Sequence, residues 1–400
     1  MSAAPGVGWT AVRIGYLSSH PIQYQVPWFR ELARQVELEV FFALRPNADL
    51  HVGAGFGVAF DWDVDLLGGY RHRFLANRAK RPGTGHFLGC DTPEIGTLIA
   101  NGRYDAFVIN GWSLKSYGQA LSACRRSRVP AFIRGDSQLT TPRSRFKKVT
   151  KELTYPWLVR SYSGALCPGA RNRDYLAYYG MPQSRLFHVP YSVDITRFAR
   201  TAEEARGRRA ALRAQWGIAP DEVVALFVGR LLPIKSPMDL LEALRHLDHG
   251  RRIRAVFAGD GPLRDDIVRA GQDLLRRPVM LGFQNQSVLP AVYAMADFLV
   301  LPSASETWGL VVNEAMACGL PAVVSDGAGC APDLIEPGRT GQIYKGGDTR
   351  ALANAMAEML PLLGSEDVTN ALRAKVAECS PEEAARAAVR AFAQVCQCSQ

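Results

Sequence analysis

Two glutamates eight positions apart, Glu306 and Glu314, are of residue types and at a spacing that could serve chemistry. Glu306 falls where the chain is expected to turn, and Glu314 falls inside an otherwise apolar helical stretch. A carboxylate in an apolar helix is costly unless a partner satisfies it. Because carboxylates accept hydrogen bonds from vicinal hydroxyls, the pair predicts contacts with a sugar and a ribose at the two ends of one ligand.

The segment between these carboxylates predicts a phosphate site. A buried strand over residues 296–303 precedes a helix that begins at about Gly309 and stops at Gly319, ahead of Pro321. The N–H groups and positive dipole end of that helix would face the carboxyl end of the strand. Such a helix start suits a phosphate, so the ligand expected here is a diphosphate joining a ribose to a sugar.

Two cations complete this pattern. Gly229 and Arg230 lie at the end of a strand that begins at residue 222, and Lys235 follows five residues later in the strand-to-helix loop. Fixed positive charge at this position could neutralise a diphosphate without a metal ion. Taken alone, the Arg and Lys could equally be ordinary surface residues, and only their coincidence with the glutamate pair favours a site.

The elements that must position these residues alternate between short β-branched runs and amphipathic helices, which is typical of parallel sheets flanked by helices. A break falls near residues 187–198, where Pro190 precedes a charged helix. The sequence therefore predicts an α/β protein with two doubly wound, Rossmann-like domains facing each other across a cleft, and ligands beyond the carboxyl ends of their strands. The expected limits are 1–190, 191–380, and a terminal helix over 381–400 that packs back on one domain.

Composition agrees with a globular protein of more than one domain, because the 400 residues are 48% hydrophobic and 21% charged. The first residues lack the pattern of a signal peptide, and no run reaches the length of a bilayer-spanning helix. The eight cysteines are scattered, with only Cys396 and Cys398 close together. We expect reduced thiols, no metal site, no nucleic-acid module and a cytoplasmic location.

The net charge of +9 is uneven along the chain. Residues 1–190 contain 24 Lys and Arg against 13 Asp and Glu, and five of the basic residues fall in one run, residues 143–151. That run is either a solvated helix face or a surface for an anionic acceptor or anionic lipid. Peripheral contact with the inner membrane face is therefore an open expectation.

Five segments in the second half resemble, in order and spacing, the donor domain of the retaining glycosyltransferases of family 4, the glycosyl transferases group 1, which have the GT-B fold. They are the sequences GRLLPIK, AGDGPLR, VMLGF, MADFLVLPSASETWGLVVNEAMACGLPAVVSD and GAGCAPDLIEPGRTGQIY, and the resemblance covers about 120 residues. It implies a metal-independent hexosyltransferase, such as those of polysaccharide biosynthesis, with a nucleotide diphosphate sugar as co-substrate and no cofactor. The acceptor would be a glycan, a lipid-linked compound or a small molecule.

The resemblance also implies roles for individual residues. Arg230 and Lys235 would hold the donor diphosphate, Glu306 would contact the transferred sugar, and Glu314 would contact the ribose. Backbone N–H groups at the helix start would bind phosphate, and a turn would lie beside the base. The remaining donor-side candidates are Gly229, Thr307, Trp308, Gly309, Leu310, Val311, Gly282 and Phe283, of which Trp308 could instead fill core.

The first half departs from the family pattern. The loop after the first strand holds His20 where relatives often have a glycine pair, and His20 either faces the cleft or only holds the loop. Arg134 and Asp136 stand where relatives often place a histidine that contacts the sugar. These three residues are the candidates for the cleft in the first domain.

The sequence also bears on four other interpretations. Asp61, Asp63 and Asp65 alternate along an expected strand, so they would share one face, either bare to water or holding a metal as in the GT-A architecture. The absence of a G-x-G-x-x-G fingerprint at the first strand disfavours NAD. A sugar-nucleotide epimerase of GT-B-like shape, and a non-catalytic donor-binding subunit, remain as alternative functions.

Overall fold

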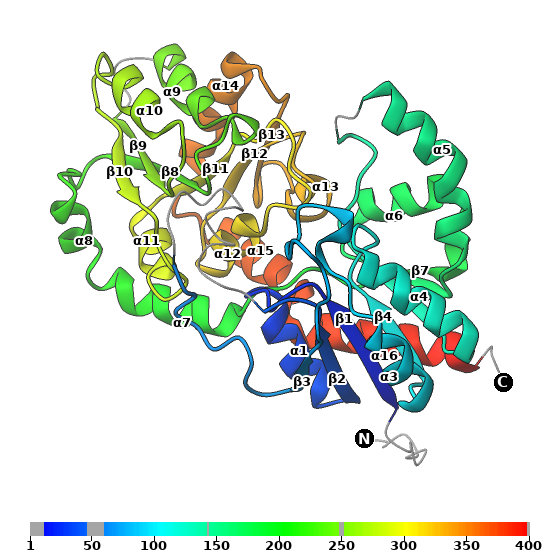
Figure 1. Cartoon of the computed structure of the whole chain (residues 1–400). Coiled ribbons are helices and arrows are strands. Elements are labelled where there is room, and N and C mark those ends of the chain that lie inside the picture. Colours follow the sequence, from blue (N-terminus) through cyan, green and yellow to red (C-terminus); the bar gives the residue numbers. More distant parts are fainter. Residues whose placement is uncertain (1–11, 46–59, 142–143, 248–251, 398–400) are drawn as a thin grey trace.

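The computed structural model describes residues 12–45, 60–141, 144–247 and 252–397 (Figure 1). Over these ranges the chain forms two parallel β-sheets, each flanked by helices, in two lobes that face each other across a cavity. The predicted fold class is therefore confirmed. The predictions that concern Arg143, Cys398 and the first residues of the chain fall outside the described ranges.

In the described part of the chain, the first sheet has seven strands in the order β3-β2-β1-β4-β5-β6-β7, all paired in parallel. Alternate residues of β1 pack on opposite faces, since Tyr16 joins one apolar cluster and Leu17 joins another. The strands are β1 (Arg13–Ser18), β2 (Glu37–Phe42), β3 (Arg71–Phe74), β4 (Ala106–Ile109), β5 (Ala131–Arg134), β6 (Gly164–Cys167) and β7 (Leu186–His188). The helices are α1 (Gln25–Ala33), η2 (Phe87–Gly89), α3 (Glu94–Asn101), α4 (Lys115–Ser127), α5 (Arg145–Arg160), α6 (Ala170–Tyr178) and η3 (Gln183–Arg185).

The second sheet, within the same described ranges, has six parallel strands in the order β10-β9-β8-β11-β12-β13. They are β8 (Val223–Val228), β9 (Ile253–Ala258), β10 (Val279–Gly282), β11 (Phe298–Leu301), β12 (Ala322–Ser325) and β13 (Gly341–Tyr344). The helices are α7 (Ile195–Arg206), α8 (Arg209–Gln215), η4 (Pro233–Lys235), α9 (Pro237–His246), α10 (Arg264–Ala270), α11 (Leu289–Met295), α12 (Leu310–Ala317), α13 (Ala331–Leu334), α14 (Thr349–Met359), η5 (Leu360–Leu362) and α15 (Glu366–Glu378).

The last helix, α16 (Pro381–Gln397), returns to the first lobe and packs against α1 and the first sheet (Figure 1). Its alanine-rich face is buried, and the ring of Phe392 lies 5.1 Å from that of Phe132 on β5. Small alanines allow this close approach to the neighbouring helix, while the phenylalanine adds a large buried ring. The two lobes are thus tied by the chain at two places, after β7 and before α16.

The order of the second sheet determines where its loops converge. From β8 to β10 the strands are added on one side of β8, and from β11 to β13 on the other side. The strand order therefore reverses between β8 and β11, which are neighbours in the sheet. Ligands of open α/β sheets bind at such a switch point, beyond the carboxyl ends of the strands. The loop after β8 carries Arg230 and Lys235, and the loop after β11 carries Glu306.

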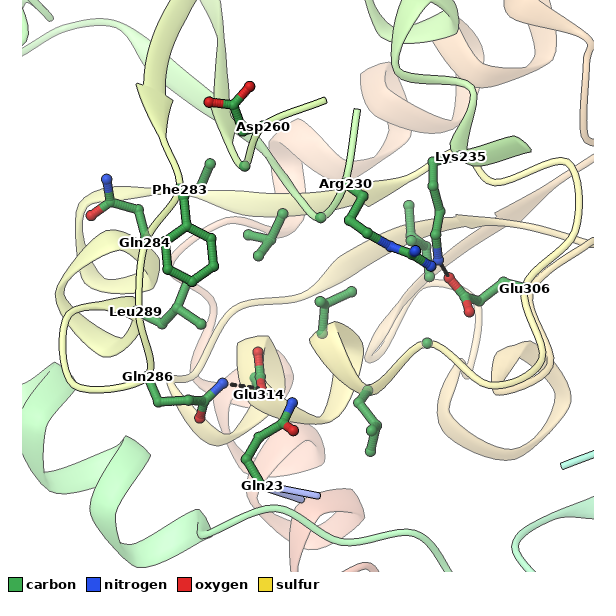
Figure 2. A pocket seen from close by; sticks show the side chains of 18 of the residues that line it. Gln23, Arg230, Lys235, Asp260, Phe283, Gln284, Gln286, Leu289, Glu306 and Glu314 are labelled. Carbon is green, nitrogen blue, oxygen red and sulfur yellow. Dashed lines mark hydrogen bonds and ion pairs between the residues drawn. The ribbon is translucent and has the colours of Figure 1, made fainter. Parts of the chain in front are cut away.

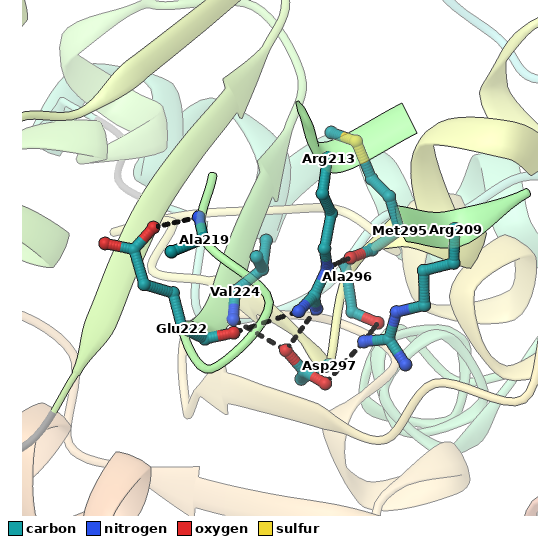
Figure 3. Close-up of polar contacts among 8 residues, drawn as sticks. All are labelled: Arg209, Arg213, Ala219, Glu222, Val224, Met295, Ala296 and Asp297. Atoms are coloured by element: carbon teal, nitrogen blue, oxygen red, sulfur yellow. Dashed lines mark hydrogen bonds and ion pairs between the residues drawn. The ribbon is translucent and has the colours of Figure 1, made fainter. Parts of the chain in front are cut away.

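A cluster of charged residues holds α8 against this sheet (Figure 3). Arg213 donates to Asp297 at 2.6 Å and to the carbonyl of Glu222 at 2.9 Å, and Arg209 donates to Asp297 at 2.5 Å. The backbone N–H of Val224 also donates to Asp297, at 2.7 Å. A buried ion pair is stable only when further hydrogen bonds satisfy its polar atoms, and here the backbone at the start of β8 supplies them. The cluster thereby fixes the start of β8, the strand that ends just before Gly229 and Arg230.

The strand expected at Asp61, Asp63 and Asp65 is wrong, because the structure has bends and irregular backbone there. The three aspartates do not share a face: Asp65 accepts from the N–H groups of Leu67 and Gly68, at 3.0 Å each, whereas Asp63 contacts Ser287 of the second lobe. Among the described residues no group of three or more Asp, Glu, His or Cys side chains is arranged to hold a metal ion.

None of the helices in the described ranges combines the length and the apolar content needed to cross a bilayer.

Candidate active site

A cavity of about 230 Å³ lies at the carboxyl ends of the second sheet's strands (Figure 2). Its wall is built mainly by the second lobe, and two of its residues come from the first. The lining residues are Gln23, Trp62, Val228, Gly229, Arg230, Lys235, Ala258, Gly259, Asp260, Phe283, Gln284, Gln286, Leu289, Leu301, Glu306, Gly309, Leu310, Val311 and Glu314. The cavity thus brings together nine of the twelve second-lobe residues that the sequence singled out.

The start of α12 faces this cavity as the sequence predicted. Gly309 has φ of +107°, and a Cβ atom there would lie 2.8 Å from the Leu301 side chain. Glycine is therefore required both by the left-handed backbone and by the contact with β11. This tight turn leaves the first N–H groups of α12, at Leu310 and Val311, beside the cavity, where they suit an anion.

Lys235 and Glu306 form a direct ion pair in the cavity wall. Their side chains retain only 17% and 15% of their accessible surface, so the pair is shielded from water. Figure 2 shows the guanidinium of Arg230 turned toward the same pair. Glu306 and Lys235, which the sequence analysis assigned to different parts of a ligand, are therefore paired with each other, and sequence reasoning did not foresee this contact.

The loop carrying Glu306 is held from the first lobe. Gln138 donates to the backbone carbonyl of Glu306 at 2.9 Å, and Thr307 donates from Oγ1 to Asp136 at 2.9 Å. Burial raises the pKa of the Asp136 carboxyl, and the hydrogen bond from Thr307 lowers this pKa by a smaller amount. Asp136 therefore lies beside the Glu306 loop, at the junction of the two lobes.

Trp308 and Thr307 do not line the cavity. The indole of Trp308 is 4% exposed, donates to Asn313 Oδ1 at 2.9 Å, and packs edge-on against Tyr191. The sequence allowed Trp308 either to contact the donor or to fill the core, and the structure shows that it fills the core. Gly282 lies at the end of β10, directly before Phe283, with φ of +70°.

Glu314 is satisfied by two neighbours, although its helix is otherwise apolar. Tyr293 donates its hydroxyl to one carboxylate oxygen at 2.8 Å, and Gln286 donates to the other at 3.4 Å. Only 7% of Glu314 is exposed, yet it lines the cavity. Burial raises the pKa of the Glu314 carboxyl, while these two hydrogen bonds act in the opposite direction.

The raised pKa of Glu314 gives a testable pH dependence. The folded state binds this proton more tightly than the unfolded state, so the stabilising contribution of the protonated carboxyl is present at low pH and is lost as pH rises through the folded-state pKa. We therefore expect Glu314→Gln to gain stability relative to wild type as pH rises from acidic to neutral values. Urea unfolding across that range measures the difference between the two free energies of unfolding.

Glu358→Gln is the matched control, because Glu358 is an exposed glutamate on α14. Its difference from wild type should change far less with pH. A difference for Glu314→Gln that stays constant across the range would contradict the assignment.

The first-lobe candidates fall in different places. Arg134 is buried, donates to the carbonyls of Val189 and Pro190 at 3.0 and 3.2 Å, and lies over the Trp28 ring at 4.4 Å. Its charge thus holds the segment that leaves the first lobe, and it lines a second hollow rather than the cavity beside α12. His20 pairs through Nδ1 with the Ser19 hydroxyl at 2.9 Å and is not among the cavity-lining residues.

Sequence reasoning missed several residues of the wall. Gln23 lies on the same loop as His20, and Asp260 lies in the strand-end turn after β9, so strand-end position could have found both. Gln286 has no motif of its own, and its role as a partner of Glu314 needs the fold. Trp62 lies in a segment whose path the sequence did not predict.

Known proteins resemble this chain in sequence and in fold. Residues 208–366 match the family model described as glycosyl transferases group 1. D-inositol 3-phosphate glycosyltransferase from Nocardia farcinica is 34% identical over 199 residues, which is 47% of this chain and 42% of that protein. The corresponding protein from Mycobacteroides abscessus is 38% identical over 165 residues, 40% of this chain and 37% of its own. The chain therefore aligns with less than half of these relatives.

Solved structures match over nearly the whole chain. Anabaena HepE in complex with UDP superposes with a TM-score of 0.71 at 17% identity, covering 96% of this chain and all of that one. Sucrose-phosphate synthase from Thermosynechococcus elongatus gives 0.67 at 19% identity, covering 96% and 98%. At such identities the likeness shows the fold alone. The chain has the two-domain GT-B fold, and residues 208–366 have the sequence pattern of the glycosyl transferases group 1.

Proposed function

We propose that this protein is a retaining, metal-independent hexosyltransferase that moves a sugar from a nucleotide diphosphate sugar to an acceptor hydroxyl. The observation that carries the proposal is the convergence of Arg230, Lys235 and the start of α12 on one cavity, with Glu306 beside the cations. Such an arrangement stabilises the charge that develops on a departing diphosphate. We propose a cytoplasmic role in polysaccharide or glycolipid synthesis, with a glycan, a lipid-linked compound or a small molecule as acceptor.

The proposed chemistry follows from the two ends of the cavity. The bond between the sugar and the diphosphate breaks while Arg230 and Lys235 neutralise the leaving group. The acceptor hydroxyl forms its bond on the face that the diphosphate leaves, and its proton passes to the leaving phosphate oxygen, so that configuration is retained without a protein base. Glu306 would orient the sugar, and Glu314 would accept from the ribose hydroxyls.

Binding of nucleotides tests the proposal. Anabaena HepE was crystallised with UDP and with UDP-glucose, so UDP is the first nucleotide to measure, followed by GDP, ADP and TDP. Calorimetry in EDTA should show micromolar binding of one of them. Binding by none, or binding only with added Mg²⁺, would overturn the assignment of the cavity.

Incubation of the protein with the corresponding nucleotide sugar, in the absence of an acceptor, distinguishes a transferase from an epimerase. A transferase gives slow hydrolysis at most, whereas an epimerase converts the free donor into a second nucleotide sugar. A non-catalytic subunit would bind donor but transfer nothing to any acceptor, including the phosphorylated inositol named for the Nocardia relative.

We also propose that α5 contacts an anionic membrane. Val149, Leu153 and Trp157 are spaced four residues apart on one helix face and are 60%, 78% and 73% exposed. The basic run is not one surface, because Lys151 turns inward to the Tyr155 and Tyr175 rings, but Arg145 and Lys148 are exposed beside the apolar stripe. An apolar stripe flanked by cations favours the interface of an anionic bilayer.

Leu153→Ser combined with Trp157→Ser should weaken binding to phosphatidylglycerol-containing vesicles by at least about 10-fold, because each large apolar side chain contributes roughly 1.5–3 kcal/mol on burial. Cosedimentation at low salt measures this, and phosphatidylcholine vesicles should bind both proteins weakly. Trp216→Ser, which removes an exposed tryptophan after α8, is the control and should leave binding unchanged. Equal binding by the stripe variant and wild type would refute the membrane contact.

A further inference from the structure

A segment of the first lobe, residues 60–68, reaches the second lobe beside the cavity. Asp63 accepts from the backbone N–H and the hydroxyl of Ser287, the former at 3.1 Å. Asn285 donates its side-chain amide to the carbonyl of Asp61 at 2.8 Å. The backbone N–H of Asp63 also donates to Asn285 Oδ1, at 3.5 Å. These polar contacts join this segment, which we call the crossing segment, to the loop between β10 and α11.

The other end of the crossing segment is fixed to the first lobe. Arg30 on α1 donates to the carbonyls of Asp65 and Gly68, at 2.8 and 2.9 Å. Asp65 in turn accepts from the N–H groups of Leu67 and Gly68, which closes a turn and lowers the pKa of the Asp65 carboxyl. The crossing segment therefore bridges two lobes through contacts at both of its ends.

Between these anchors, aromatic side chains meet the cavity. The ring of Phe60 lies 4.2 Å from that of Phe283, and Trp62 is one of the two first-lobe residues in the cavity wall. Phe283 follows β10, which is the edge strand of its sheet, so no other strand in the described part of the chain covers this side. The crossing segment occupies that side and completes the wall there.

The cavity consequently has two chemically different ends. Arg230, Lys235 and the start of α12 form the cationic end. Trp62, Phe283 and Gln284 form an end of aromatic and amide groups, at the loops after β10 and in the crossing segment. Flat aromatic faces with nearby amides suit a nucleobase, which stacks on rings and pairs through its edge.

We propose that Trp62 of the first lobe forms part of the binding site for the nucleoside end of the donor, and that Asp63 is the positioning residue that holds it there. This proposal rests on the proposed function, because it assumes that a nucleoside diphosphate occupies the cavity. It adds that the nucleoside is held by both lobes, so nucleotide release requires the Asp63–Ser287 contacts to open.

Comparison of UDP with inorganic pyrophosphate tests this assignment by calorimetry. Trp62→Ala should weaken UDP binding about 10-fold or more, by the magnitude of base–aromatic stacking, and leave pyrophosphate binding unchanged. Trp62→Phe should recover most of the loss, since it retains a flat ring. Asp63→Asn should raise the UDP dissociation rate in stopped-flow measurements while sparing pyrophosphate, because an amide cannot accept both hydrogen bonds from Ser287 through two oxygens.

The outcomes separate the two proposals. If wild type binds neither UDP, the other nucleotides nor pyrophosphate, the proposed function fails and this inference fails with it. If wild type binds UDP and Lys235→Ala weakens that binding, but Trp62→Ala does not, only this inference is overturned. An equal loss of UDP and pyrophosphate in Trp62→Ala would also overturn it, because that result marks a general structural defect. Trp216→Ala, outside the cavity, is the matched tryptophan control and should bind both ligands as wild type does.

Discussion

Lys235→Ala is expected to weaken binding of the preferred nucleoside diphosphate by about 100-fold, because truncating one partner of a buried hydrogen-bonded charge pair costs about 2–5 kcal/mol. The loss has two causes. The variant removes a cation from the cationic end of the cavity, and it leaves the Glu306 carboxylate, only 15% exposed, without its ion-pair partner. An unpaired carboxylate repels an incoming diphosphate.

Calorimetry on wild type and variant measures this loss, and pyrophosphate should lose affinity to a similar extent because Lys235 belongs to the phosphate end. Lys345→Ala is the matched control, since Lys345 is an exposed lysine after β13 of the same lobe. Its nucleotide affinity should equal that of wild type. If Lys235→Ala binds the nucleotide with wild-type affinity, the proposal that Lys235 holds the diphosphate is wrong.

Much of the fold could be predicted because the buried strands are continuous β-branched and aromatic runs between helices with apolar faces. Strands β3, β7 and β13 are harder to predict, because they lie at sheet edges and are short, with sequences RHRF, LFH and GQIY. An edge strand is paired on one side and partly exposed, so its sequence lacks a buried pattern. These segments become strands because they pair with the neighbouring strand, and not because their own residues strongly prefer the extended conformation.

The second-lobe site could be predicted because its residues come from strand ends and one helix start, whose geometry is local. Gly309 is fixed by a turn, and Arg230 and Lys235 by the end of β8. Contacts between distant segments were not readable in the same way. The Gln286–Glu314 hydrogen bond joins residues 28 apart, and the Asp63–Ser287 contact joins residues 224 apart.

The aspartates at 61, 63 and 65 show why such contacts escape sequence reasoning. Their alternation fits a strand, but Gly68 and Gly69 and the turn closed by Asp65 favour an irregular path. The partner of Asp63 lies in the other lobe, so only the folded arrangement reveals that this carboxylate serves as an anchor between lobes.

Glu306→Gln should separate binding from transfer, in contrast to Lys235→Ala. Glu306 forms an ion pair with Lys235, so a diphosphate must compete with this carboxylate for the cation. An amide competes less, and UDP should therefore bind Glu306→Gln as tightly as wild type, or up to about 10-fold more tightly. Transfer should nevertheless fall by about 100-fold or more, because the charge proposed to orient the sugar and stabilise its developing positive charge is gone.

The double variant completes this argument. If the two residues act through their ion pair, Glu306→Gln should partly restore the nucleotide affinity that Lys235→Ala loses, because the repelling carboxylate is absent. The two effects on UDP binding would then differ from additivity by about 1–3 kcal/mol, as is usual for side chains in direct contact. Weaker UDP binding in Glu306→Gln would instead mean that the carboxylate helps to hold the nucleotide, and strict additivity would mean that the ion pair has no part in admitting the donor.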